Sequence, residues 1–285
     1  MTDYKKRKKT FVLIIPRFED LLSSFYAGEI IRGACLGASR LKTDILVHIT
    51  DRENHRGWLD SSLLDRRYVD GIIFGDIDND VAVVTKAILA GMPCMVLNNI
   101  LNLPMNYVAI NNFAATLEVM DYLIKAGHKK IATISGDLTT QAGQMRLEGY
   151  KQALKKNDLS DASEYIGYGE FLRTPARDAA KKILKLKDRP TAIFAASDVM
   201  ALEVIDVAKS LNLKVPQDVS VIGFDDNPIN SASSVKLTTV AQPLAEMGRV
   251  GVETLHQISL GKAKLPAKTI LETRFIKRDS VKEIK

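Results

Sequence analysis

The sequence predicts an α/β protein with two lobes, each built around a doubly wound parallel sheet. Short, almost continuously apolar, β-branched runs alternate with segments whose apolar residues recur every three or four positions. This alternation runs twice, before and after about residue 127. The chain's 285 residues are too many for one small core and suit two α/β lobes of ordinary size.

The expected strands are apolar on both faces, as strands covered by helices on both sides of a parallel sheet require. The first series lies at 11–15, 45–49, 69–74, 94–97 and 108–110. The second series lies at 130–134, 165–168, 191–195 and 219–224. Strands that alternate with helices indicate βαβ units with right-handed crossovers.

Helices are expected between these strands, at 27–41, 81–90, 114–126, 146–156, 176–186 and 201–211. Gly91 and Gly127 follow two of them, and glycine suits this position because it adopts the left-handed conformation without a Cβ clash. After the second series come another amphipathic helix, at 244–260, and a closing strand near 269–276. Periodicity alone assigns these last two elements to neither lobe.

The net charge of +6 is concentrated at the N-terminus. The first nine residues hold five basic side chains, at 5–9, and one acid, Asp3, so they carry four of the six net charges. The remainder of the chain is therefore nearly neutral, and the pI of about 9.1 is no evidence for a nucleic-acid-binding surface on it. We interpret residues 1–9 as a solvated basic tail or a linker stub.

Targeting and cofactor signals are lacking. The apolar stretch at 11–15 is too short for a signal peptide or a membrane span, so the chain is expected in the cytoplasm. Cys35 and Cys94 both sit in apolar segments and are expected to be buried thiols. No spacing of cysteine or histidine suggests a metal, so we expect no metal and no cofactor.

Enzyme signatures are also lacking. The sequence holds no phosphate-binding loop, dinucleotide fingerprint, nucleophile elbow or zinc-protease motif. The four histidines are scattered, and His128, at a helix–strand junction, is interpreted as structural. We therefore predict that the chain is not an enzyme.

Polar residues follow most of the expected strands. Because the carboxyl ends of strands face the ligand crevice in open α/β sheets, their recurrence predicts a binding site. Each alone would be an ordinary helix cap or turn. The pairs are Pro16-Arg17, Thr50-Asp51, Gly75-Asp76, Asn98-Asn99 and Asn111-Asn112 in the first half, and Ser135-Gly136, Ser197-Asp198 and Asp225-Asp226 in the second.

An ordered set of motifs spans residues 10–280. They are FY at 25–26, EIIRG at 29–33, VDGII at 69–73, GHKKIA at 127–132, RLEGY at 146–150, RPTAI at 189–193, SDVMA at 197–201, VPQDVSVIGFDD at 215–226 and LTTV at 237–240. On these motifs the chain resembles the effector-binding core of the LacI/GalR family of bacterial transcriptional regulators. That core has the fold of periplasmic sugar-binding proteins.

The resemblance implies three chain crossings between the lobes, near residues 127, 242 and 268. The N-terminal lobe would then hold 10–127 and 243–268, and the C-terminal lobe 128–242 and 269–285 with the closing strand. Full-length members begin with a helix-turn-helix DNA-binding domain, which does not precede Phe11 here. The chain is then a fragment cut at the linker or a natural member without a DNA reader.

The family's ligand contacts map onto three main residues. Arg146 matches a ligand-contacting arginine, whose fork of donors suits a carboxylate, a phosphate or two sugar hydroxyls. Asp225 matches the ligand carboxylate and is also expected to pair with Arg146 in the empty cleft. Phe171 matches an aromatic residue that covers the ligand. The alternatives are a surface arginine, a turn aspartate and a core phenylalanine.

Further contacts are predicted at Phe25 and Tyr26 on the opposite lobe, or these two pack under the first strand instead. Ser197, Asn111 and Gln242 are weaker candidates, and Asn111 stands where the family often has aspartate. The segment at 138–145 is expected to be a loop at the cleft edge.

The function implied is that of a homodimeric sensor. A small polar effector, a sugar or glycoside by preference, would bind between the lobes and control DNA binding by a helix-turn-helix domain outside this chain, with no membrane partner. The alternatives are a sugar-binding protein without a DNA reader, and an enzyme acting on a sugar or nucleoside with Asp198 or Asp225 as its base.

Overall fold

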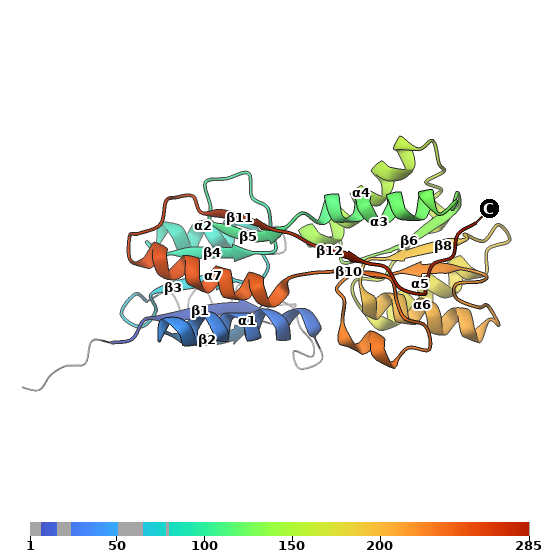
Figure 1. Ribbon diagram of the computed structural model, residues 1–285. Helices are drawn as coiled ribbons and strands as arrows, with labels where there is room; N and C mark the ends of the chain where they lie inside the picture. Colours follow the sequence, from blue (N-terminus) through green and yellow to red (C-terminus); the bar gives the residue numbers. More distant parts are fainter. Residues whose placement is uncertain (1–6, 16–23, 51–64, 78–79, 285) are drawn as a thin grey trace, which may run out of the picture. The chain divides into compact units, whose positions relative to one another are not determined.

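The computed structural model describes residues 7–15, 24–50, 65–77 and 80–284 (Figure 1). The chain divides into two compact units. Unit 1 comprises Met1–Ile110 and Pro243–Leu271, and unit 2 comprises Asn111–Gln242 and Glu272–Lys285. The three crossings thus fall at 110/111, 242/243 and 271/272, whereas the resemblance implied 127, 242 and 268.

The first crossing differs because helix α3 (Asn112–Lys125) belongs to unit 2. This helix packs closely on α4 (Gln141–Lys156). A Cβ on Gly149 of α4 would lie 2.8 Å from Cβ of Thr116 in α3, so the two helices meet where only a glycine fits.

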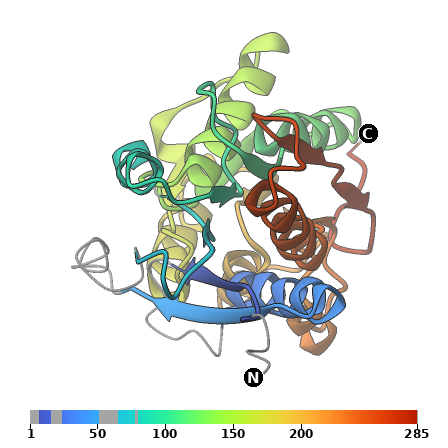
Figure 2. The same cartoon turned by 90° about the vertical axis from the view of Figure 1, so that its left-hand side faces the viewer.

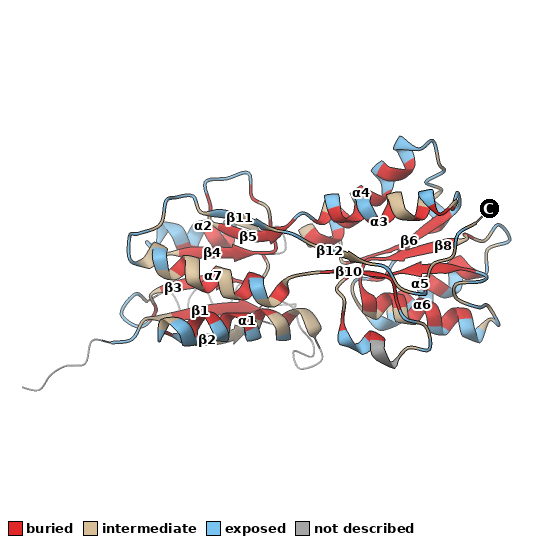
Figure 3. Ribbon diagram, viewed as in Figure 1, coloured by how far each residue is buried: buried red, intermediate tan, exposed pale blue. Residues whose placement is uncertain are grey.

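Unit 1 contains a six-stranded parallel sheet in the order β11-β5-β4-β3-β1-β2. Its strands are β1 (Thr10–Ile15), β2 (Asp44–Ile49), β3 (Gly71–Phe74), β4 (Cys94–Leu97), β5 (Tyr107–Ile110) and β11 (Lys268–Leu271). The central strands β3, β4 and β5 are buried throughout, as strands covered on both faces must be (Figure 3). The predicted doubly wound fold is confirmed for this unit.

Helices cover both faces of this sheet (Figure 2). Val83, Val84 and Ala87 of α2 (Val81–Leu89) pack on one face. The other face carries α1 (Phe25–Leu41) and α7 (Leu244–Ser259), which pack tightly on each other. The family resemblance placed the 244–260 helix in this lobe, and the structure has it there.

Unit 2 contains a four-stranded parallel sheet in the order β7-β6-β8-β9. The strands are β6 (Ile131–Ser135), β7 (Ile166–Tyr168), β8 (Ala192–Ala195) and β9 (Ser220–Ile222). Helices α5 (Arg173–Leu184) and α6 (Asp198–Ser210) bury alanine, isoleucine and valine side chains against one face. On α4, the hydroxyl of buried Tyr150 donates to the Ile131 carbonyl of β6.

The predicted closing strand is two strands, one in each unit. Lys268–Leu271 forms β11 and pairs with β5 in unit 1. Arg274–Ile276 forms β12, which pairs antiparallel with β10 (Thr239–Ala241) in unit 2. The assignment of the whole 269–276 segment to the C-terminal lobe is therefore wrong for its first half, because the chain crosses between units within it.

Two further expectations differ from the structure. Cys94 is buried, but Cys35 is exposed because it lies on the outward side of α1. The basic tail is not wholly solvated: Arg7 pairs with Asp70 at 3.0 Å, and Lys9 approaches the same carboxylate at 3.8 Å. The backbone N–H of Thr10 also donates to Asp70, which fixes the start of β1.

His128 is fully buried, and its ring nitrogens contact Thr191 Oγ1 at 2.9 Å and the Lys282 carbonyl at 3.2 Å. These contacts hold the C-terminal segment against unit 2 and agree with a structural role for this histidine. Burial lowers its pKa, so the ring stays neutral near pH 7.

Candidate functional site

The unit 2 sheet has a topological switch point between β6 and β8. From β6, the first strand of this unit, the chain adds β7 on one side and then β8 and β9 on the other. In doubly wound sheets, ligands bind outside the carboxyl ends of the strands at such a point. Here those ends are Ser135 on β6 and Ala195 on β8, followed by Ala196 and Ser197.

Arg146 is buried beside this switch point. Its side chain is 3% exposed, although the guanidinium is charged. Nε donates to Asn112 Oδ1 at 2.8 Å, and Nη1 donates to the Ala196 carbonyl at 2.6 Å. The alternative of a surface arginine is therefore wrong.

The backbone around Arg146 differs from the predicted loop. Helix α4 begins at Gln141, where Thr140 caps it by accepting a hydrogen bond from the Gly143 N–H. The expected loop at 138–145 is therefore wrong from residue 141 onward, and Arg146 lies in the second turn of the helix. The helical pattern extends further back than predicted because Gln141, Ala142 and Gln144 are ordinary helix residues.

Two aromatic rings flank the guanidinium. The Arg146 Cζ atom lies 3.7 Å from the centroid of the Phe224 ring and 5.7 Å from that of Phe171. Cations within about 6 Å of an aromatic centroid are attracted by the ring quadrupole. Stacking and hydrogen bonds together leave Arg146 one well-defined position.

Asp225 faces Arg146 across the site. One carboxylate oxygen lies 3.9 Å from Arg146 Nη1 and accepts a hydrogen bond from Gln242 Nε2 at 2.6 Å. The expected pairing of Arg146 with Asp225 is thus present at the outer limit of an ion pair. Burial raises the pKa of Asp225 to about 7, the Arg146 charge opposes that rise, and the nearby Asp198 carboxylate adds to it.

Phe171 is half-buried and has a left-handed backbone, with φ of +59°. Its ring lies over Gly136, where an added Cβ would be 2.0 Å from Phe171 Cζ. A side chain at position 136 would therefore displace the Phe171 ring from this place. Phe171 also packs on the apolar cluster under α5 and α6, so the alternative of a core phenylalanine is partly correct.

The weaker candidates have local roles as well. Ser197 caps α6 by accepting from the Met200 N–H, and Asn111 caps α3 by accepting from the Ala114 N–H. Gln242 donates to Asp225, but its Oε1 is buried without a hydrogen-bond partner. Such an unsatisfied acceptor is uncommon and marks a place where a ligand donor would be stabilised.

Two residues of the site were not predicted as contacts: Asn112 was named only as half of a strand-end pair, and Phe224 only as a strand residue. Asn112 is buried and holds Arg146, whereas its exposed neighbour Asn111 was predicted. The Asn111-Asn112 pair indicated where the amide contact would lie in the sequence. Which of the two side chains turns inward depends on the residue at which α3 begins. Phe224 reads as a strand residue in sequence, and its stacking role depends on the tertiary placement of Arg146.

Phe25 and Tyr26 lie in the first turn of α1, in unit 1. Both are half-buried, and the Tyr26 hydroxyl donates to the Gly75 carbonyl at the end of β3. At the same edge, the Asn98 Oδ1 and Thr50 Oγ1 atoms are buried without partners. Of the predicted polar pairs, Pro16-Arg17 and Asp51 lie outside the described residues.

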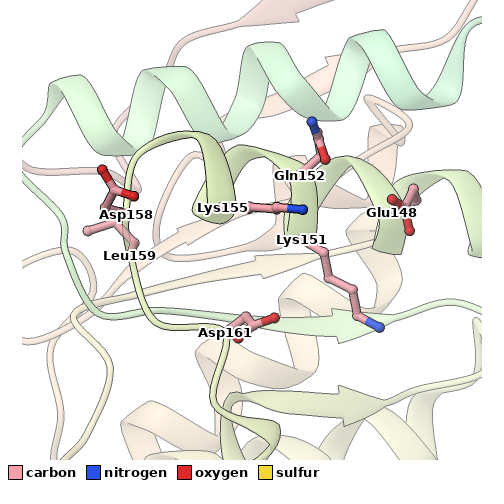
Figure 4. A pocket seen from close by; sticks show the side chains of 7 residues that line it. All are labelled: Glu148, Lys151, Gln152, Lys155, Asp158, Leu159 and Asp161. Carbon is pink, nitrogen blue, oxygen red and sulfur yellow. The ribbon is translucent and has the colours of Figure 1, made fainter.

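A separate hollow follows the outer side of α4 (Figure 4). It has a volume of about 390 Å³ and is lined by Glu148, Lys151, Gln152, Lys155, Asp158, Leu159 and Asp161. Its lining carries charges of both signs, and none of the predicted site residues lines it. It therefore contributes nothing to the Arg146 site.

The described residues offer neither a metal-binding cluster nor a membrane-spanning helix. They contain no group of three or more His, Cys, Asp or Glu side chains placed to hold a metal ion. Nor does the described part of the chain contain a helix with the length and hydrophobicity needed to cross a bilayer.

Two α/β units, each built on a parallel sheet, are typical of a periplasmic-binding-protein-like fold. The buried arginine lies at the sheet switch point where such folds bind ligands. A family model described as a periplasmic binding protein-like domain matches residues 120–281. The transcriptional regulator CelR in complex with cellobiose superimposes with a TM-score of 0.87 and 26% identity, covering 97% of this chain and 86% of that one.

Curated relatives are bacterial transcriptional regulators. The HTH-type regulator DegA of Bacillus subtilis (strain 168) is 31% identical over 96% of this chain and 81% of its own length. The HTH-type repressor CytR of Escherichia coli (strain K12) is 30% identical over 98% of this chain and 81% of its own length. The chain belongs to the LacI/GalR family of transcriptional regulators.

Proposed function

We propose that this chain is the sensing core of a transcriptional regulator and that its effector is a sugar or glycoside bound at the Arg146 site. The observation that carries the proposal is the fixed, 3%-exposed guanidinium of Arg146 at the β6/β8 switch point. Burying a charge is costly, and a fold that keeps one at its ligand-binding edge does so for a polar ligand.

The neighbouring groups suit hydroxyl-bearing ligands. The Asp225 carboxylate and the unpartnered Gln242 Oε1 both accept hydrogen bonds, so they complement adjacent donors such as paired hydroxyls. Phe171 offers an aromatic face of the kind that covers a sugar ring. The cellobiose bound to the structurally similar CelR supports the sugar class over other polar ligands.

Four further residues stay predictions with less support. Phe25 and Tyr26 are proposed as contacts contributed by unit 1, and Ser197 by unit 2. Asn111 is the weakest, because its side-chain oxygen is engaged in capping α3. Loss of affinity in Tyr26→Ala, with none in Asn111→Ala, would support this ranking.

Regulation would follow from differential affinity. A ligand that binds one conformation of the two units better than another shifts the population toward it by the ratio of the two affinities. In a homodimer carrying DNA-binding domains, such a shift would change the spacing of the two readers on half-sites about one helical turn apart. The proposed place of action is the cytoplasm, and the proposed core has no enzymatic step.

The first experiment is a thermal-shift screen of the whole chain against sugars, glycosides, sugar phosphates and nucleosides, followed by calorimetry on any hit. A ligand at about 100 times its dissociation constant adds roughly 2.7 kcal/mol of stability. We expect a glycoside hit that is lost in Arg146→Lys and Asp225→Asn. Glu203→Gln, which alters a buried acid of α6 outside the site, should keep it.

Each other outcome is informative. A hit that survives both site variants would overturn the site assignment. A hit restricted to nucleosides would overturn the ligand class and keep the site. Turnover of the bound ligand would replace the sensor by the enzyme alternative, and persistent failure of every class to bind would remove the sensing function.

A further inference from the structure

Asp198 is a fully buried acid next to the site, and the proposed ligand contacts do not use it. It is the first residue of α6, and its side chain is completely shielded from solvent. The carboxylate accepts three hydrogen bonds, from Thr239 Oγ1 at 2.6 Å, the Asn227 N–H at 2.7 Å and Asn230 Nδ2 at 2.6 Å. Burial raises the pKa of Asp198, and the three hydrogen-bond donors, which favour its charged form, oppose that rise.

These three partners belong to different parts of unit 2. Asn227 and Asn230 lie in and beside the short helix η4 (Pro228–Ala232), and Thr239 lies on β10. The backbone N–H of Asp198 also donates to the Phe224 carbonyl at 2.7 Å. One side chain and its own N–H therefore tie the start of α6 to both ends of the 225–230 turn and to the neighbouring strand.

That turn is strained where it carries the site. Asp225 has φ of +126° and Asp226 has φ of +56°, two consecutive non-glycine residues with positive φ. Such conformations are unfavourable for residues with a Cβ and persist only where surrounding contacts enforce them. The strain directs the Asp225 carboxylate toward Gln242 and Arg146.

A second tie holds the same turn from the C-terminal segment. Arg278 Nη2 pairs with Asp226 Oδ1 at 2.6 Å, and Nη1 donates to the Leu237 carbonyl. Arg278 fixes Asp226 from the solvent side, at about 30% exposure for both side chains, whereas Asp198 works from within the core. Asp198 is therefore the buried half of the support.

We propose that Asp198 is a positioning residue for the ligand site: its buried carboxylate enforces the strained 225–230 turn and thereby aims Asp225 at Arg146 and Gln242. It touches no ligand itself. The proposal goes beyond the proposed function and rests on it only in so far as Asp225 contacts the effector.

The proposal has an electrostatic consequence. Two charged groups act on the Asp225 carboxylate, Arg146 from α4 and Asp198 from α6. The next residue of the turn, Asp226, is paired with Arg278 of the C-terminal segment. A nearby like charge disfavours ionisation, so the Asp198 charge makes Asp225 harder to deprotonate. Removing that charge should lower the titration midpoint of Asp225.

The test follows the Asp225 carboxyl carbon and the Gln242 side-chain amide by NMR in the full chain, from pH 4 to pH 9. The Asp225 signal is assigned by its loss in Asp225→Asn, and no ligand is needed. In Asp198→Asn we expect the Asp225 midpoint to fall by about one pH unit or more. The Gln242 amide signals should also move toward positions typical of a solvent-exposed amide.

Glu203→Gln is the matched control. Glu203 lies on the same helix, is 1% exposed and pairs with Arg173 and Arg177, so its replacement also removes a buried charge from α6. A role of Asp198 in stability alone predicts similar loss of stability in the two variants and no change at Asp225 or Gln242 in either. We expect the change in Asp198→Asn only.

Asn230→Ala keeps the test decisive if Asp198→Asn does not fold. This variant removes one tie and leaves every charge in place. We expect the Gln242 signals to broaden or shift while the Asp225 midpoint moves by less than about 0.3 pH units. Unchanged Gln242 and Asp225 signals in a folded variant would overturn the proposal, and they would do so whether or not the chain binds a sugar.

Discussion

Two buried serines of unit 2 differ in whether their hydroxyl groups have hydrogen-bond partners. Ser280 is fully buried, accepts from the Thr238 N–H at 2.8 Å and donates to the Val221 carbonyl at 2.5 Å. Ser135, at the end of β6, is equally buried but its hydroxyl has no partner. A buried hydroxyl without a partner costs free energy that an alanine in the same place would not.

We therefore predict opposite effects for one substitution at these positions. Ser280→Ala should lower the free energy of unfolding by about 1–3 kcal/mol, because it leaves the Thr238 N–H and Val221 carbonyl unsatisfied. Ser135→Ala should leave it unchanged or raise it by about 1 kcal/mol. Chemical denaturation at pH 7 measures both, and an equal loss in the two variants would contradict the assignment of the Ser135 hydroxyl as unsatisfied.

The raised pKa of Asp225 predicts a dependence of stability on pH. The folded state keeps this proton up to about pH 7, whereas the unfolded chain loses it near pH 4. Between these values the folded state binds more protons, so the contribution of Asp225 to stability is fully present at low pH and is lost as pH rises toward 7.

Asp225→Asn should remove this contribution. Between pH 5 and pH 7 we expect the wild-type chain to lose about 2 kcal/mol more unfolding free energy than the variant. Denaturant titrations at three pH values give the two slopes. Parallel slopes for the two proteins would mean that Asp225 titrates normally in the folded state.

Arg146 and Asp225, which lie in motifs, and Gln242, which lies outside them, were predicted from the sequence. The structure brings these three residues together. The roles of Asn112, which was named only within a pair, and of the Ala196 carbonyl were missed, because both depend on the direction in which a group points after a turn. That direction depends on where α3 and α4 begin, which propensity fixes only to within a few residues.

At the scale of elements, the contact of α1 with α7 depends on glycines. A Cβ on Gly33 would lie 1.8 Å from the Ala245 carbonyl oxygen, and one on Gly248 would lie 2.3 Å from the Ile30 carbonyl oxygen. The two backbones therefore approach each other more closely than any other residue would allow. The amphipathic periods of both helices were predictable, but their pairing was not, because α1 ends at Leu41 and α7 begins only at Leu244.

Two glycine-to-alanine variants of α1 test this close helix contact, one at the contact and one away from it as the control. Gly33→Ala should destabilise the chain by about 3 kcal/mol or more, because backbone must move to admit the methyl group. Gly28→Ala has nothing within 4 Å of its added Cβ and should stabilise by about 0.5–1 kcal/mol through helix propensity. Thermal unfolding of both variants gives the comparison, and similar melting temperatures would rule out the close α1–α7 contact.

The fold class of the whole chain was easier to predict from the sequence than its division into two units. Buried strands alternating with helices specify doubly wound sheets locally, without reference to distant residues. The crossings are properties of contacts between elements. Helix α3 has the same period wherever it packs, and only its contact with α4 assigns it to unit 2.

Net charge gives a prediction for the whole chain. Most of the net positive charge lies at residues 5–9, and some of these side chains already form ion pairs. Arg7 and Lys9 pair with Asp70, and Lys8 approaches Asp44 at 3.9 Å. DNA phosphates must compete with these acids. We expect weak, non-specific binding to duplex DNA, with a dissociation constant of about 10⁻⁴ M or weaker at physiological salt.

The five basic residues set an upper limit to its salt dependence. Neutralising five phosphates gives a slope of log K against log salt of about −4.5, and prior pairing with Asp70 and Asp44 should make it shallower. Glutamine at positions 5–9 should abolish binding. Glutamine at Lys151, Lys155, Lys156, Lys181 and Lys185 of unit 2 removes the same charge and should preserve it. If the second set abolished binding instead, unit 2 itself would carry a DNA-binding surface, and the assignment of DNA contacts to a separate reader domain would be wrong.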